Sequence, residues 1–182
     1  MRKTIFILLV SLIFLLPAFS YYEVPPTYAM IILNLGTINP VGLWKEAFSP
    51  APYFSLSIQY PAKVMNLYIG GKIDFTTMNG KEYRDVFFQL FSIYGYVSYN
   101  LIELEDLILY INGGLGINFE EIQFGDGTDE AILGGFKFDI GARKRAGKNL
   151  FLNLNLNYTY IPDTPFINLG VGISYSFGNL PK

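Results

Sequence analysis

The chain has 182 residues, of which 51% are hydrophobic, 17% aromatic and 15% charged, and it contains neither Cys nor His. This composition excludes a disordered chain, and a formal net charge of −2 leaves no basic excess for binding nucleic acid. Without Cys or His, disulfide frameworks, thiolate metal sites and the Ser-His-Asp triad are excluded. A metal site would need oxygen ligands only, and a carboxylate pair could still serve as acid and base, but no Asp or Glu pair is singled out by its context. We predict no catalytic residue, no metal site and no cofactor.

The first 20 residues have the pattern of an export signal. Arg2 and Lys3 precede an apolar stretch at residues 5–16, and residues 17–20 offer a helix-breaking Pro and small residues for cleavage. The apolar stretch is too short for a membrane-spanning helix, which needs about 20 such residues. We predict that residues 1–20 are a signal peptide and that residues 21–182 form a single domain.

Beyond the signal, hydrophobic residues recur with a period of two, which indicates β-strands. The clearest case is residues 150–160, where Leu and Tyr alternate with Asn and Thr. Eight segments follow this pattern in chain order, all within residues 28–177: residues 29–37, 54–60, 67–76, 86–99, 109–119, 136–141, 150–160 and 167–177. We predict that each segment is a strand.

The connectors between these strands alternate in length. Shorter connectors cover residues 61–66, 100–106 and 143–149. Long connectors cover residues 38–52, 77–85 and 120–131, and only residues 161–165 are short where a long loop is due. Short turns on one rim and long loops on the other are typical of a transmembrane β-barrel.

The position of the charges distinguishes a membrane barrel from a water-soluble sheet. Four charged residues fall inside predicted strands, all on the polar face: Lys72, Asp74, Lys137 and Asp139. The rest of that face is small and polar, which suits the crowded interior of eight strands. The other face is continuously apolar, and a Lys or Arg there would cost about 2–4 kcal/mol at the bilayer midplane. We predict that the four charges pair and plug the interior; a gated ion path is the alternative.

Three further groups of residues carry predictions of their own. Ten aromatic residues near strand ends suggest interfacial girdles, although aromatics also favour strands in general: Tyr53, Tyr60, Phe75, Tyr96, Tyr99, Phe119, Tyr158, Tyr160, Tyr175 and Phe177. Five acids at residues 120–130 offer oxygen ligands for Ca²⁺, but we favour a solvated loop. Residues 143–148 form a basic turn that either contacts anionic lipid headgroups or is merely solvated.

Taken together, these features resemble the small outer-membrane β-barrel superfamily, of the OmpA/OmpX-like eight-stranded type. The resemblance covers residues 28–177 and includes a terminal assembly signal, which Gly172, Tyr175 and Phe177 match. It implies an all-β, eight-stranded antiparallel up-and-down barrel in the bacterial outer membrane. It also implies contacts with outer-membrane lipid and insertion by the barrel-assembly machinery.

The enzymes of this superfamily depend on a histidine that this chain lacks. The resemblance therefore implies a non-enzymatic barrel with a structural or surface-interaction role, which meets an extracellular partner through its long loops. Two alternatives stay open. One is a narrow porin-like barrel or one that passes hydrophobic compounds along Phe87, Phe91 and Tyr68. The other is a soluble periplasmic barrel that binds lipid.

Overall fold

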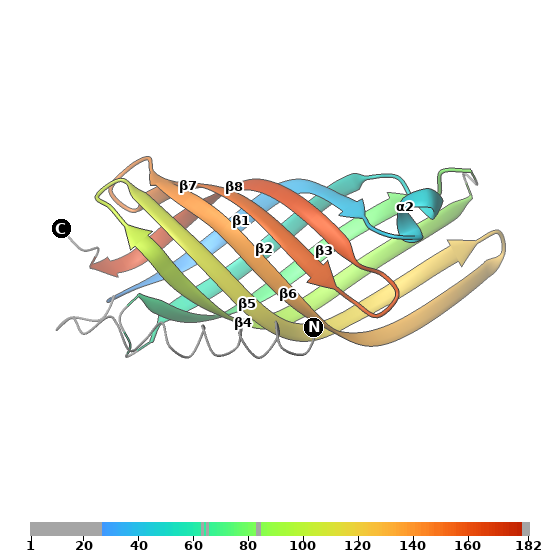
Figure 1. The fold of residues 1–182 in the computed structure, drawn as a ribbon, viewed down its shortest axis with the longest axis horizontal. Coiled ribbons are helices and arrows are strands. Elements are labelled where there is room, and N and C mark those ends of the chain that lie inside the picture. Colours follow the sequence, from blue (N-terminus) through green and yellow to red (C-terminus); the bar gives the residue numbers. More distant parts are fainter. Residues whose placement is uncertain (1–26, 63, 65, 83–84, 180–182) are drawn as a thin grey trace, which may run out of the picture.

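Eight antiparallel strands close into one up-and-down barrel, with β1 paired to both β2 and β8 (Figure 1). The computed structural model describes residues 27–62, 64, 66–82 and 85–179, so the predicted signal peptide lies outside them. The strands are β1 (Thr27–Pro40), β2 (Ala51–Pro61), β3 (Leu67–Asn79), β4 (Val86–Glu103), β5 (Leu107–Phe124), β6 (Gly127–Arg145), β7 (Leu150–Tyr160) and β8 (Phe166–Asn179). The predicted fold class is confirmed.

The two ends of the barrel differ. At one end, which we call the termini end, β1 begins and β8 ends, and three turns join β2 to β3, β4 to β5 and β6 to β7. The opposite end is the α2 end, named after the single helical turn α2 (Trp44–Ala47) that lies between β1 and β2 (Figure 1). Within the described part of the chain, no helix is long and apolar enough to span a membrane.

The alternation in the sequence determines which side chains face the interior. Along β7, Asn153, Asn155 and Asn157 are buried, while the Leu residues between them are exposed. Apolar side chains form the outer surface of the other strands too, and Leu115 is 75% exposed. This is the reverse of a water-soluble protein, and it is the arrangement that a lipid environment requires, because closure also pairs β1 with β8 and so leaves no open sheet edge around the barrel wall.

Residues 120–131 do not form the predicted long loop. Strand β5 continues to Phe124 and β6 begins at Gly127, so the connection is a two-residue turn at Gly125 and Asp126. Gly125 has a φ of +54°, a conformation that glycine adopts without steric cost in tight hairpins. The prediction was wrong because four of the five acids lie within the paired strands β5 and β6, and β4 extends this ladder as far as Val86 opposite Phe124.

Two connectors at the termini end are also shorter than predicted. Strand β4 continues to Glu103 past an irregularity in register between Asn100 and Ile102, and β6 continues to Arg145. The basic residues 143–145 therefore belong to a strand, where alternate side chains face opposite sides of the sheet. The short connection at residues 161–165, in contrast, is present as predicted.

Candidate functional site: the barrel interior and the α2 end

Two buried ion pairs cross the centre of the barrel. Lys72 Nζ lies 3.2 Å from Asp139 Oδ2, and Lys137 is paired with Asp74. Each pair joins β3 to β6, which are not neighbours in the sheet, so the side chains meet across the interior. All four predicted interior charges are thus brought together inside the barrel.

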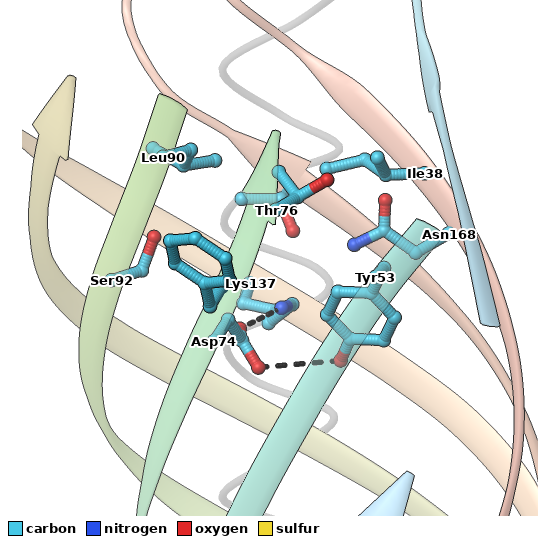
Figure 2. Close-up of a pocket in the computed structure, with 10 residues that line it drawn as sticks. Ile38, Tyr53, Asp74, Thr76, Leu90, Ser92, Lys137 and Asn168 are labelled. Atoms are coloured by element: carbon cyan, nitrogen blue, oxygen red, sulfur yellow. Dashed lines mark hydrogen bonds and ion pairs between the residues drawn. The ribbon is translucent and has the colours of Figure 1, made fainter. Parts of the chain in front are cut away.

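Tyrosine and asparagine side chains surround these charges. Tyr53 Oη donates a hydrogen bond to Asp74 Oδ1 at 3.3 Å (Figure 2), and Asn112 Nδ2 donates one to Asp139 Oδ2, also at 3.3 Å. Lys137 Nζ lies 5.3 Å from the ring centroids of both Tyr53 and Tyr94. Opposite charge, polar donors and aromatic faces together compensate for taking the ions out of water.

One small cavity lies within the barrel interior. It has a volume of about 10 Å³ and lies beside the Lys137–Asp74 pair, between Tyr53, Thr159 and Asn168 (Figure 2). That volume admits about one water molecule. The Thr159 hydroxyl and the Asn168 carbonyl oxygen are buried and have no hydrogen-bond partner among the described residues, so they would suit such a water. An acyl chain or a hydrated ion would not fit.

Apolar side chains close both ends of the interior. At the α2 end, Trp44 stacks on Phe48 and meets Phe88 edge-on, with ring centroids 4.9 Å apart in each pair. At the termini end, six inward-facing residues form a second cluster: Tyr28, Met30, Ile32, Tyr68, Ile108 and Phe151. These closures are a departure from the predicted inward face, which was expected to be small and polar throughout.

Several aromatic residues lie on a different face from the one predicted. Tyr53 and Tyr96 face the interior and do not belong to a girdle, whereas Phe87 and Phe91 face outward and line no internal path. Tyr68 does face the interior. Most of the other outward aromatic residues lie toward the two ends of the barrel, whereas Phe138 lies between them, opposite Gly113. Phe75, Phe119, Phe136, Tyr158 and Tyr160 lie toward the α2 end, and Tyr60, Tyr99, Tyr175 and Phe177 toward the termini end.

Arg143 is not part of a basic turn. Its side chain is inside the barrel and 1% exposed, with the guanidinium 4.0 Å from the ring centroid of Tyr110. Arg143 Nη2 also donates a hydrogen bond to Gln59 Oε1 at 3.1 Å. Lys144, the next residue, faces outward. A signal was present in the sequence, since Arg143 continues the inward phase of Lys137 and Asp139.

Inward-facing glycines make room for the large tyrosines of β4. The ring of Tyr94 lies over Gly116, and its hydroxyl donates a hydrogen bond to Asn118 Oδ1 at 2.7 Å. The ring of Tyr96 lies in the same way over Gly70, and its Cβ lies against Gly114. Paired large and small residues on neighbouring strands thus fill a barrel too narrow for large residues throughout.

The α2 end is acidic. The part of the β5–β6 hairpin that we call the acidic hairpin (residues 120–135) contains five acids and neither Lys nor Arg. It extends past the loop that joins β7 to β8 (Figure 1). Glu120 faces inward and accepts a hydrogen bond from Thr164 Oγ1 at 2.7 Å, while Asp126, Asp129 and Glu130 are exposed. No cluster of three or more potential metal ligands is present among the described residues.

The residues of the predicted assembly signal all lie in β8. The Gly172 backbone approaches Asn34 of β1, the strand that closes the barrel. Tyr175 and Phe177 face outward, with ring centroids 4.9 Å apart. Strand β8 continues beyond this motif to Asn179. Recognition of the motif by an assembly machinery stays a prediction.

The closed, eight-stranded barrel with an apolar exterior has the fold of small outer-membrane barrel proteins. Neisserial surface protein A superposes with a TM-score of 0.67 at 15% identity, covering 85% of this chain and 100% of its own. OprG, an outer membrane protein of Pseudomonas aeruginosa, gives 0.61 at 11% identity, covering 85% and 98%. Ail of Yersinia pestis gives 0.57 at 14% identity, covering 85% and 100%. No protein-family model matches the chain, and no curated protein matches it.

Proposed function

We propose that this chain is an exported, non-enzymatic barrel of the bacterial outer membrane that acts at the cell surface through its α2 end. One observation carries the proposal: the outside of the barrel is apolar, whereas ion pairs and aromatic clusters fill the inside. Such a barrel is suited to lie in lipid but not to pass solutes. The similar solved structures, which are bacterial outer-membrane proteins, support the location.

The outer surface supports a defined position in the bilayer. Outward aromatic residues toward the two ends would lie at the two interfaces, as in membrane barrels generally. Between them, β5 presents apolar residues outward from Leu109 to Phe119, and the next outward residue is Glu121. That segment has the length of a tilted transmembrane strand, about 9–11 residues. The part of the acidic hairpin beyond Phe119 and its cross-strand partner Ile132 would then stand clear of the membrane.

The filled interior argues against both alternatives from the sequence. A porin-like path would have to cross the Lys72–Asp139 and Lys137–Asp74 pairs and both aromatic closures. A soluble lipid carrier would need a cavity, and its apolar outer surface would be exposed to water. The remaining features that could contact another molecule are the projecting acidic hairpin and the loops beside it.

The charge of the α2 end indicates which sign of charge a partner should carry. Ail forms a complex with the heparin analogue sucrose octasulfate, which is a polyanion. Here the acidic hairpin has no Lys or Arg, and the nearby described bases are Lys45 and Lys81. A positively charged partner therefore suits this chain better than a polyanion.

The location is tested by heating and fractionation. We expect the protein in the detergent-extracted outer-membrane fraction, with an SDS-gel mobility that changes on boiling, because closed barrels keep their edges paired. Extraction from cells without detergent, with no mobility shift, would contradict the proposal.

The orientation is tested by labelling intact cells with a membrane-impermeant amine reagent. Lys45 and Lys81 at the α2 end and Lys144 and Lys148 at the termini end are all exposed. We expect the first two to react in intact cells and the second two only after permeabilisation. The opposite pattern would place the acidic hairpin in the periplasm.

A further inference from the structure

The acidic hairpin has one paired edge and one free edge. On one side, β4 follows β5 along its full length to the turn. On the other side, β7 pairs with β6 only from Phe136, which lies opposite Tyr160. Among the residues that the structure describes, no strand pairs with β6 at residues 128–134, which we call the free edge.

The register indicates which backbone groups the free edge offers. In a two-residue hairpin, the residue after the turn, Gly127, bonds back to Phe124 of β5. Antiparallel pairing then alternates, so Asp129, Ala131 and Leu133 direct their backbone groups to β5. The intervening residues direct theirs away from β5, toward the unoccupied side: Thr128, Glu130, Ile132 and Gly134. The free edge is therefore a template for one more strand.

The side chains of the hairpin favour a cationic partner. Glu121 lies directly opposite Glu130, and like charges in such a cross-strand pair destabilise a sheet. Asp129 and Asp126 add negative charge nearby without any basic residue in the hairpin. The edge lacks the Lys and Pro residues that commonly keep free edges from pairing. A second copy of this chain would bring acid against acid, which disfavours self-association.

We propose that the free edge of β6 binds an extended, positively charged peptide segment of another protein, which adds to the sheet as a further strand. The inference rests on the proposed function, because it requires the α2 end to lie outside the membrane. Backbone hydrogen bonds supply affinity in this mode of recognition, and side chains on alternate positions supply specificity. Here Lys or Arg side chains on one face of the peptide would lie beside Asp129, and apolar side chains on the other face would contact Ile132, which shares its face with Glu130 and is 71% exposed.

The probe for the test is a labelled peptide of alternating Lys and Val, about eight residues long, which matches the length of an ordinary strand. Binding to the folded full-length protein in lipid nanodiscs is measured by fluorescence anisotropy at low salt. Control peptides replace Lys with Glu, or carry methyl groups on alternate backbone nitrogens. Ile132→Pro blocks the edge without removing a bond to β5, and Ile132→Ala is its matched control.

We expect the Lys-Val peptide to bind the wild type and Ile132→Ala, and to bind Ile132→Pro about tenfold more weakly or worse. The N-methylated and Glu-Val peptides should bind the wild type as weakly as the Lys-Val peptide binds Ile132→Pro. The replacement of Asp129 by Asn together with Glu130 by Gln should reduce affinity and its dependence on salt. Equal binding to Ile132→Pro and the wild type would show attraction by charge alone and would overturn the proposal, as would no binding of the Lys-Val peptide.

Amide exchange measured by NMR gives a second readout that does not depend on the proline variant. The Lys-Val peptide should slow exchange at residues 128, 130, 132 and 134 and leave residues 129, 131 and 133 unchanged. Uniform or absent protection would contradict strand addition. The same sample is also run boiled and unboiled on an SDS gel. An unfolded or soluble protein would show no mobility shift on that gel, so failure of the proposed function is distinguished from failure of strand addition.

Discussion

Gly116→Ala should destabilise the barrel because the added methyl group has no room. A Cβ at Gly116 would lie 2.2 Å from the Ile93 carbonyl oxygen and 2.5 Å from Cδ1 of Tyr94. The Tyr94 ring cannot turn away freely, since its hydroxyl is hydrogen-bonded to Asn118. The backbone of β4 would have to move. Overpacking of a filled core typically costs about 1–3 kcal/mol, and contact with a backbone atom places this case near 3 kcal/mol.

Gly113→Ala is the matched control on the same strand. Gly113 faces outward, and nothing lies within 4 Å of a Cβ built there. We expect its free energy of unfolding to be unchanged or about 0.5 kcal/mol higher, because Ala loses less backbone entropy than Gly on folding. Reversible urea unfolding in lipid vesicles, read from the fraction of heat-shifted protein on a gel, compares the variants. Equal losses for Gly113→Ala and Gly116→Ala would refute the assignment of inward and outward faces.

Three further perturbations test the interior. Asp139→Asn leaves Lys72 unpaired and should lower the free energy of unfolding by about 3–5 kcal/mol. Lys72→Met combined with Asp139→Leu removes both charges and should cost much less. Equal losses in the two variants would mean that an unpaired charge is not what destabilises Asp139→Asn. Arg143→Lys keeps the charge but loses the flat contact with Tyr110, and we expect a loss of about 1–2 kcal/mol in the same assay. Unchanged stability would contradict that role. Trp44→Ala loosens the α2 end, yet planar bilayers should show no conductance steps because the ion pairs remain. Clear steps would contradict a plugged interior.

The fold was predictable because one pattern recurs in most of the strands. The alternation of Leu and Asn along β7 predicts both a strand and the face that each side chain takes. The confinement of Lys72 and Asp139 to the polar phase then indicates which face is inside. These features are local in the sequence, so no knowledge of distant contacts is needed to interpret them.

The strand ends and the closure of the interior depend on distant contacts and were not predictable in the same way. The acids at residues 120–131 suggest a solvated loop, but pairing with β4 and a two-residue turn keep them in a ladder. Arg143 is accommodated only because Tyr110 and Gln59, from two other strands, meet it inside the barrel. Likewise, Tyr94 fits only because a glycine lies beside it on β5.

The central claim is that the apolar face of each strand contacts lipid while the polar face is sealed inside. Because the chain contains no Cys, single cysteines can be placed along β7 and spin-labelled without background. In lipid vesicles, we expect collision with dissolved oxygen to be high at Leu152, Leu154 and Leu156 and low at Asn153 and Asn155. Uniform accessibility along β7, or higher oxygen collision at the Asn positions, would contradict the account.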